Sequence, residues 1–283
     1  MISRPYRSVL YIPGSKPRAI DKARGLPVDA IIFDLEDAVS PEEKASARDT
    51  LAEELAKGGF GARFKMVRIN GLDTEWGEAD ARAAATMQAD AVLVPKVGSA
   101  TRLNEVSTLT GNARLWAMME TPTGILHASS IAAHPLLDGF VMGTNDLAKE
   151  LRSRSTPDRL AMLPALGHCL LAARAHGIAI VDGVYNAFKD NEGLAAECRQ
   201  GRDMGFDGKT LIHPAQVEIA NAEFGPSEAE LDLARRQIEA YEAAKASGQG
   251  VAVVDGKIVE NLHVDTAQSL LAQAEAIAAI AKG

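Results

Sequence analysis

Short hydrophobic runs alternate with longer amphipathic stretches along most of the chain. Eight runs are apolar almost throughout, as expected for parallel strands buried on both faces: Ser8–Ile12, Ala30–Asp34, Lys65–Ile69, Ala91–Pro95, Leu115–Met119, Gly139–Met142, Ile178–Val181 and Gly208–Leu211. Regular strand–helix alternation of this length favours a closed (β/α)8 barrel over an open doubly wound sheet. The pattern therefore predicts an α/β protein of the TIM-barrel class.

Helix start and stop signals lie between the runs. Ser40 before Pro41, and Thr156 before Pro157, each predict an N-cap followed by proline at the first helical position. Gly177 is expected to end the helix that begins at the second of these signals.

The pattern changes after the eighth run. It predicts a helix over 227–246, a flexible break, a β-hairpin over 251–259 with a type I′ turn at Asp255-Gly256, and a helix over 264–282. We therefore expect a catalytic barrel over residues 1–225 and a carboxyl-terminal extension over 226–283. This helix–hairpin–helix extension is too small to be an independent domain, so we interpret it as a lid or an oligomerisation arm.

Composition narrows the function classes. The chain has 283 residues, of which 47% are hydrophobic, and this is enough for one large α/β domain. Its net charge of −8 argues against nucleic-acid binding. It has no apolar span of about 18 residues and no signal-peptide pattern, so we expect a cytoplasmic protein without a membrane partner. Cys169 and Cys198 are expected to be reduced.

Polar residues follow almost every predicted strand, on the rim where barrel active sites are assembled. In chain order they are Lys16, the acidic run Asp34-Leu35-Glu36-Asp37, Arg68, Lys96, Glu120, Asp146 and His213. Walker A, dinucleotide-binding and nucleophile-elbow motifs are absent from the sequence, so nucleotide hydrolysis, dinucleotide binding and serine hydrolysis are poorly supported.

Glu120 and Asp146 are the sharpest pair on this rim. They end two consecutive strands, which would lie about 5 Å apart in the sheet. Two carboxylates with open positions suit Mg²⁺, which keeps waters and takes further oxygen ligands from a substrate. The alternative is that both residues cap the helices that follow them.

The basic residues have two interpretations each. Arg68, at the end of a buried strand, either anchors a substrate carboxylate or pairs with the acidic run, and Lys96 carries the same alternatives. Arg7, Lys16 and Arg18 surround a glycine turn that is able to hold a phosphate, although solvated side chains are the default. His213 is either a general base or, as we favour, a cap residue.

Taken together, these segments resemble the citrate lyase β-subunit-like group of the HpcH/HpaI aldolase superfamily. The similar segments occur in family order between residues 7 and 220: 7–14, 29–39 with Phe33-Asp34-Leu35-Glu36-Asp37, 67–70, 95–97, 119–122, 143–147 and 205–214. Several specific motifs in one order make a chance match improbable.

The resemblance implies a trimeric or hexameric (β/α)8 barrel that makes or breaks a carbon–carbon bond beside a CoA thioester, with Mg²⁺ as cofactor. It implies that Glu120 and Asp146 bind Mg²⁺, that Arg68 binds the oxygens of a 2-oxo acid, and that Glu36 and Asp37 orient Arg68 or metal-bound water. It further implies that Arg7 and Lys16 face the CoA phosphates or the thioester. The candidate substrate-binding residues are thus Arg7, Lys16, Arg68, Lys96 and Glu120.

Lyases of this family that act on free CoA thioesters resemble one another in a carboxyl-terminal lid, which brings an acid, usually Asp, to a neighbouring subunit's site. Glu260 occupies the matching place here and is the candidate catalytic acid, with Asp265 second. Glu260 is one methylene longer than Asp, so it either reaches the same proton or positions water for thioester hydrolysis. The alternative is an exposed hairpin residue without a role.

Four functions are compatible with the sequence. We expect a Mg²⁺-dependent lyase that cleaves a small (3S)-hydroxyacyl-CoA, such as malyl-CoA or citramalyl-CoA, to acetyl-CoA and glyoxylate or pyruvate. The alternatives are a (3S)-malyl-CoA thioesterase, a citrate lyase β-subunit acting on a carrier-protein thioester, and a metabolite-binding regulator.

Overall fold

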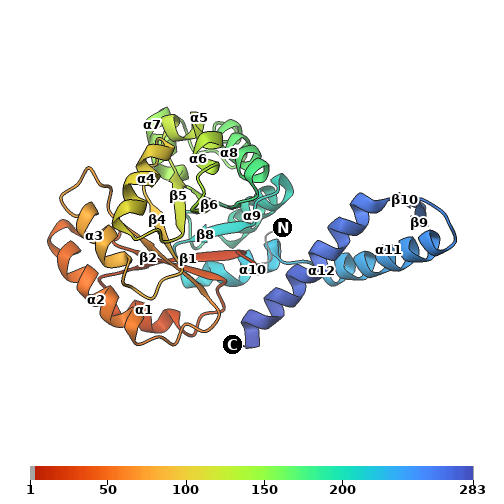
Figure 1. The fold of residues 1–283 in the computed structure, drawn as a ribbon, viewed down its shortest axis with the longest axis horizontal. Coiled ribbons are helices and arrows are strands. Elements are labelled where there is room, and N and C mark those ends of the chain that lie inside the picture. The colour runs from red at the N-terminus through yellow and green to blue at the C-terminus, as the bar shows by residue number, and fades with distance from the viewer. Residues whose placement is uncertain (1–3, 283) are drawn as a thin grey trace. The chain divides into compact units, whose positions relative to one another are not determined.

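The computed structural model describes residues 4–282, and its first compact unit, Tyr6–Phe224, is a closed parallel barrel (Figure 1). Each strand pairs with the next along the chain, and β1 pairs with β8 to close the barrel. The strands are β1 (Ser8–Pro13), β2 (Ala30–Asp34), β3 (Phe64–Arg68), β4 (Ala91–Val94), β5 (Leu115–Met119), β6 (Leu137–Met142), β7 (Ala179–Asp182) and β8 (Gly208–Leu211). The predicted (β/α)8 barrel is therefore confirmed.

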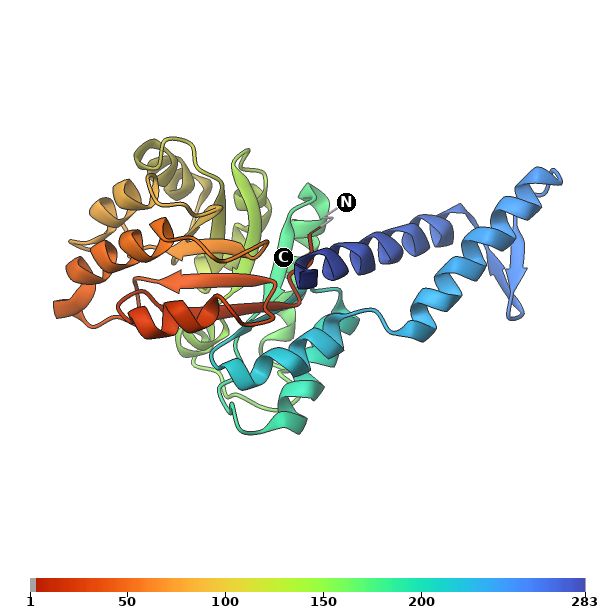
Figure 2. The ribbon, with the colours of Figure 1, turned by 90° about the horizontal axis from the view of Figure 1, so that it is seen from below.

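Helices connect the strands on the outside of the barrel (Figures 1 and 2). They are α1 (Pro17–Ala23), α2 (Lys44–Ala56), α3 (Gly77–Ala84), α4 (Ala100–Leu109), α5 (Pro122–Leu126), α6 (Ala128–Ala132), α7 (Thr144–Leu151), α8 (Leu163–His176), α9 (Asn191–Met204) and α10 (Val217–Phe224). Short 3-10 turns, Pro41–Glu43 and Pro214–Gln216, precede α2 and α10.

Aromatic side chains fill the amino-terminal end of the barrel. The fully buried Trp116 packs against Tyr6, with ring centroids 5.0 Å apart, and against Phe64 at 6.0 Å. Gly139 on β6 makes room for the indole, because a Cβ there would lie 2.7 Å from its ring atoms. This end is closed by packed side chains, which leaves the carboxyl end for a site.

Two helix starts differ from the predictions. The helix expected after Thr156 begins only at Leu163, because the intervening residues form turns that include Arg159 in a left-handed conformation, with φ of 54°. Residues 41–43 form a 3-10 turn instead of the first turn of an α-helix, and Ser40 makes no capping bond. The predicted stop at Gly177 is confirmed, since this residue ends α8 in the left-handed conformation.

The second compact unit comprises the chain from Gly225 onward, together with Arg4 and Pro5. Helix α11 (Glu228–Ala246) begins with a capping box between Ser227 and Glu230. Strands β9 (Ala252–Val254) and β10 (Lys257–Val259) form the predicted hairpin, and helix α12 (Asn261–Lys282) starts three residues before its predicted beginning. Helices α11 and α12 pack against each other.

The hairpin has two different faces. Its turn residues, Asp255 and Gly256, have φ of 49° and 74°, as a type I′ turn requires. Its inner face packs on the two helices through the buried residues Ala252, Val254 and Val259. No helix among residues 4–282 combines the length and the apolar character that crossing a membrane would require.

Candidate active site at the carboxyl end of the barrel

A cavity of about 310 Å³ opens at the carboxyl ends of the strands. Charged groups from β2, β3, β5 and α7 line one part of it: Asp34, Asp37, Arg68, Glu120 and Asp146. Apolar and aromatic side chains also line it, among them Tyr11, Met118, Met142, Val184 and Ile212. The cavity therefore combines charged and apolar groups, as sites for small ligands commonly do.

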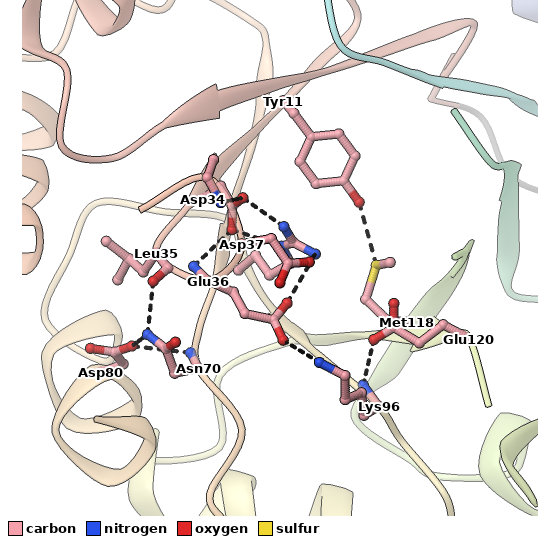
Figure 3. A network of polar contacts seen from close by, with 12 residues as sticks. Tyr11, Asp34, Leu35, Glu36, Asp37, Asn70, Asp80, Lys96, Met118 and Glu120 are labelled. Carbon is pink, nitrogen blue, oxygen red and sulfur yellow. Dashed lines mark hydrogen bonds and ion pairs between the residues drawn. The ribbon is translucent and has the colours of Figure 1, made fainter. Parts of the chain in front are cut away.

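Arg68 is the centre of an ionic cluster with the three acids of the run 34–37, which are labelled in Figure 3. Its Nε and Nη2 donate to the two carboxylate oxygens of Asp34 at 2.7 and 2.6 Å. Its Nη1 donates to Asp37 Oδ2 at 3.2 Å and lies 2.9 Å from Glu36 Oε2, outside hydrogen-bond geometry. The structural pairing with the acidic run is thus present, and Arg68 still faces the cavity.

The acidic run itself is fixed through its backbone. The ammonium of the buried Lys44 donates to the carbonyl oxygens of Leu35 and Glu36 at 3.1 and 2.8 Å. The amide of Asn70 donates to the Leu35 carbonyl at 2.8 Å and to Asp80 at 2.6 Å (Figure 3). Because these contacts leave the carboxylates free to point elsewhere, the loop presents Asp34, Glu36 and Asp37 in a defined arrangement.

Lys96 connects this cluster to the next strands. Its Nζ donates to Glu36 Oε1 at 3.0 Å, while its backbone N–H donates to Glu120 Oε1 at 2.7 Å (Figure 3). Its backbone is left-handed, with φ of 47°. Lys96 is not among the residues that line the cavity, so its geometry fits a role in holding carboxylates better than the predicted contact with substrate.

Glu120 carries the most perturbed carboxyl group of the cavity. It is only 2% exposed at the end of β5, and burial, together with the negative charges of Glu36 and Asp146, raises its pKa to about 7. The Lys96 N–H and Arg68 partly oppose this shift. Burial raises the pKa of Glu36 as well, although Arg68 lowers it. Carboxylates that raise one another's pKa in this way indicate a site suited to a cation.

Neither Glu120 nor Asp146 is the N-cap of the helix that follows it, although Asp146 lies in the first turn of α7, where an acid favours the helix. Helix α5 is capped by Thr121, whose Oγ1 accepts from the Gly124 N–H, and the N-cap of α7 is Gly143. Asp146 lies half-buried in the first turn of α7. Within residues 4–282, its carboxylate makes neither a hydrogen bond nor an ion pair.

The charge around the cavity is unbalanced. Five carboxylates, those of Asp34, Glu36, Asp37, Glu120 and Asp146, face two cations, Arg68 and Lys96, which gives a formal charge of −3. The described part of the chain contains no cluster of three or more metal-ligating side chains. Two carboxylates with open positions nevertheless fit Mg²⁺, which completes its octahedron with water and substrate oxygens.

Arg7 is a correction to the predicted site. It precedes β1 and so lies at the amino end of the barrel, where its guanidinium pairs with the buried Asp29 at 2.8 and 2.9 Å. The cavity is at the opposite end of the strands, and Arg7 does not line it. The sequence already carried a signal against Arg7, because it precedes its strand, whereas residues of the site follow theirs.

Other predicted residues have mixed outcomes. The cap interpretation of His213 is confirmed, because its Nδ1 accepts from the Ala215 N–H at 3.1 Å. Lys16 follows β1 and forms an exposed pair with Glu43, so its contact with CoA stays a prediction. Glu260 is exposed between β10 and α12, and its backbone N–H donates to His263. Its catalytic role also stays a prediction.

Among the cavity residues that the sequence did not single out, Tyr11 and Gly143 lie against its charged groups. Tyr11 points inward from β1, its ring 5.1 Å from the Arg68 guanidinium carbon and its hydroxyl 3.5 Å from Met118 Sδ (Figure 3). Gly143 lies against Glu120, and a Cβ there would be 2.4 Å from the Glu120 Cβ. Both lie in segments that the strand pattern identified, but only the packing shows their importance.

The barrel and its rim of carboxylates match a known family. The model of the HpcH/HpaI aldolase/citrate lyase family matches residues 7–214, so this chain belongs to that family. It is an enzyme family whose relatives act on thioesters of CoA or are subunits of citrate lyase, as their names state.

Relatives from bacteria extend the similarity over nearly the whole chain. A protein of Cereibacter sphaeroides named (3S)-malyl-CoA thioesterase is 67% identical over 98% of this chain and 97% of its own. The L-malyl-CoA/beta-methylmalyl-CoA lyase of Cereibacter sphaeroides is 34% identical over 98% of this chain and 97% of its own. The citrate lyase subunit beta of Leuconostoc mesenteroides is 35% identical over 95% of this chain and 93% of its own.

Solved structures show the same architecture. The crystal structure of protein CitE from Mycobacterium tuberculosis, in complex with magnesium, acetoacetate and coenzyme A, has a TM-score of 0.81 and 29% identity. The similarity covers 97% of this chain and 100% of that one.

Proposed function

We propose that this protein is a thioesterase that hydrolyses a small (3S)-hydroxyacyl-CoA, (3S)-malyl-CoA, with Mg²⁺ as cofactor. The observation that carries the proposal is the 67% identity, over nearly full length, to a protein named (3S)-malyl-CoA thioesterase, against 34% for the malyl-CoA lyase. From the sequence alone we expected a lyase, with the thioesterase as an alternative. This difference in identity makes the thioesterase the first candidate.

The cavity supplies groups for each part of such a substrate. Glu120 and Asp146 would hold Mg²⁺, which supplies a Lewis acid for the hydroxyl and carbonyl oxygens of the acyl group. Arg68 provides a positive charge for the malyl carboxylate. That carboxylate would replace Asp37, whose side chain is 65% exposed and only loosely held. The apolar residues Val184 and Ile212 suit the thioester arm.

Hydrolysis also needs a group that orients water toward the thioester carbonyl. Glu260 is our candidate, because its side chain is exposed and makes no ion pair in the described chain. As a carboxylate it would accept a proton from water while the C–S bond breaks and the thiolate of CoA leaves. Its extra methylene relative to Asp would place the carboxylate nearer to water than to an acetyl methyl group.

The products distinguish thioester hydrolysis from carbon–carbon cleavage. Purified protein is incubated with (3S)-malyl-CoA and, separately, (3S)-citramalyl-CoA, with Mg²⁺ or with EDTA, and all products are resolved by mass. The proposal expects free CoA and malate in Mg²⁺ and neither in EDTA, with the Glu120→Gln variant as the inactive control. Formation of acetyl-CoA and glyoxylate would replace the thioesterase with a lyase.

A lyase is the second candidate, favoured by the similarity to the malyl-CoA lyase over 98% of this chain. It would yield acetyl-CoA and glyoxylate, or pyruvate from the methyl-substituted substrate. The Glu260→Asp variant separates the two reactions. If the side-chain length selects hydrolysis, the shorter acid shifts products toward acetyl-CoA. Unchanged product ratios would show that the side-chain length of Glu260 does not select between hydrolysis and cleavage.

A citrate lyase β-subunit is the third candidate, and the citrate lyase subunit beta of Leuconostoc mesenteroides supports it at 35% identity. Its substrate would be a thioester borne by a carrier protein. Neither CoA ester would then react, and the chain would co-purify with carrier and transferase subunits.

We further propose that the protein is a homotrimer or homohexamer in which the carboxyl-terminal unit serves as a lid on a neighbouring barrel. The hairpin supports this, because Val253 and Ile258, which pair across its strands, are 66% and 62% exposed on its outer face. Such an apolar face favours contact with other protein. Co-expressing the Glu120→Gln and Glu260→Ala variants tests it. Mixed oligomers regain activity only if lid and barrel act across subunits.

A further inference from the structure

Lys96 has an unusual backbone for its residue type. It follows β4 after Pro95 and adopts a left-handed conformation, with φ of 47°, that side chains other than Asn, Asp and Gly rarely adopt. Such a conformation persists only where the surrounding contacts fix it. The angle φ sets the direction of the side chain relative to the residue's own N–H. The contacts of the Lys96 N–H and of its ammonium therefore together explain the left-handed backbone.

The backbone contact orients Glu120. The Lys96 N–H donates to Glu120 Oε1 at 2.7 Å. On the opposite side Gly143 allows close packing, since a Cβ there would lie 2.5 Å from Glu120 Oε2. Within residues 4–282, Oε2 makes no hydrogen bond. One oxygen of this carboxylate is therefore engaged by the backbone, and the other is available to the cavity.

The side-chain contact involves a different carboxylate. Lys96 Nζ donates to Glu36 Oε1 at 3.0 Å, and the other oxygen of Glu36 lies 2.9 Å from Arg68. One residue thus connects the Arg68 cluster to Glu120 through two separate groups (Figure 3). The Lys96 ammonium donates to Glu36, and Lys96 is not among the residues that line the cavity.

We infer that Lys96 is a positioning residue with two separable parts: its left-handed backbone aims Glu120 at a divalent cation, and its ammonium holds Glu36 beside Arg68. The inference rests on the proposed function in naming the cation and, for its side-chain part, the substrate whose turnover is measured. The backbone part governs cation affinity in the absence of substrate. The side-chain part governs turnover through the Glu36–Arg68 arrangement.

Substitutions at this one position separate the parts. Lys96→Gly and Lys96→Asn remove the ammonium but permit the left-handed backbone, whereas Lys96→Val disfavours it. Lys96→Arg keeps a cation for Glu36. Binding of Mn²⁺ to each full-length, substrate-free variant is measured from the electron paramagnetic resonance signal of free Mn²⁺. Values of kcat and KM are measured with (3S)-malyl-CoA.

We expect Lys96→Gly and Lys96→Asn to bind Mn²⁺ within about threefold of the wild type, and Lys96→Val to bind it about tenfold or more weakly. Lys96→Gly should lower kcat about tenfold with little change in KM, and Lys96→Arg should restore most of it. Circular dichroism and the melting temperature report whether each variant folds. If Lys96→Val does not fold, Lys96→Ala replaces it, with an affinity between those of the Gly and Val variants.

Equal Mn²⁺ affinity for the Gly variant and for the folded Val or Ala variant would overturn the inference, as would a wild type that binds no Mn²⁺. A wild type that binds Mn²⁺ but does not hydrolyse malyl-CoA would instead refute the proposed function and, with it, the turnover part of the inference, while the Mn²⁺ affinities would still decide the backbone part.

Discussion

The barrel contains two clusters of buried charge whose balance differs. At the rim of the cavity, five carboxylates face two cations. Behind β7 and β8, a second cluster has two of each: Asp182 and Glu197 with Arg159 and Lys209. Asp37 and Lys96 at the rim are exposed, but Asp34, Arg68 and Glu120 are as buried as the second cluster, so the comparison concerns what neutralises the buried carboxylates.

In the balanced cluster every charge has a protein partner. The buried Asp182 accepts from Arg159 Nη1 at 2.9 and 2.7 Å and from Lys209 Nζ at 3.1 Å. Burial alone would raise the pKa of Asp182, but these two cations lower it below its usual value. At the rim the pKa of Glu120 instead rises to about 7. The balanced cluster is structural, whereas the unbalanced one needs a ligand to complete it.

The largest effect is expected in the balanced cluster. Lys209→Met leaves Asp182 and Glu197 short of a cation in a fully buried position. We expect the free energy of unfolding to fall by about 3–5 kcal/mol, because an uncompensated buried charge remains. Urea denaturation measures this, and Mg²⁺ affinity of the folded variant should be unchanged. A loss of Mg²⁺ binding without a loss of stability would reverse the roles of the two clusters.

At the rim, Asp146→Ala should affect activity instead of stability. The carboxylate makes no contact among the described residues that folding would lose, so the melting temperature should stay within a few degrees. We expect kcat/KM with (3S)-malyl-CoA to fall by about two to three orders of magnitude. Asp203→Ala, at an exposed residue of α9, is the matched control. Full activity of the Asp146→Ala variant would refute the assignment of Asp146 as a cation ligand.

Glu120→Gln should stabilise the cation-free protein at high pH. The folded pKa of Glu120, about 7, lies above its ordinary value of 4.5, so ionisation in the folded state costs stability as pH rises between these values. At pH 8 in EDTA the variant should be more stable by about 3 kcal/mol, and below pH 4.5 the difference should vanish. Urea denaturation at both pH values measures it. A variant less stable than the wild type at pH 8 would contradict the unbalanced-charge account.

The smallest effect is expected at an exposed pair. Lys16 and Glu43 are 53% and 45% exposed, so Lys16→Ala should change the free energy of unfolding by less than about 1 kcal/mol. If Lys16 contacts CoA phosphates as predicted, KM should rise severalfold while kcat stays constant. An unchanged KM would contradict the predicted contact between Lys16 and CoA.

Much of the fold could be predicted because continuous apolar runs specify buried parallel strands. All eight strands form within a few residues of their predicted bounds. The start of α8 was mispredicted because Thr156-Pro157 carries a local start signal, whereas tertiary ion pairs hold Arg159 in a left-handed turn.

The site was less predictable than the fold. Order along the chain identified Glu120 and Asp146, since each follows a strand and both line the cavity. The same rule, applied strictly, excludes Arg7, which precedes its strand. The balanced cluster was not predicted, because Lys209 lies within an apolar run and Asp182, which directly follows another, was not paired with it from the sequence. The left-handed backbone of Lys96 has no sequence signal in a non-glycine residue.

The most direct test of the unbalanced rim is calorimetric titration of Mg²⁺ into the substrate-free protein at pH 8, in parallel with the Glu120→Ala/Asp146→Ala double variant. The account predicts one Mg²⁺ bound per chain in the wild type and none in the double variant. Equal Mg²⁺ binding by both proteins, or no binding by the wild type, would contradict it.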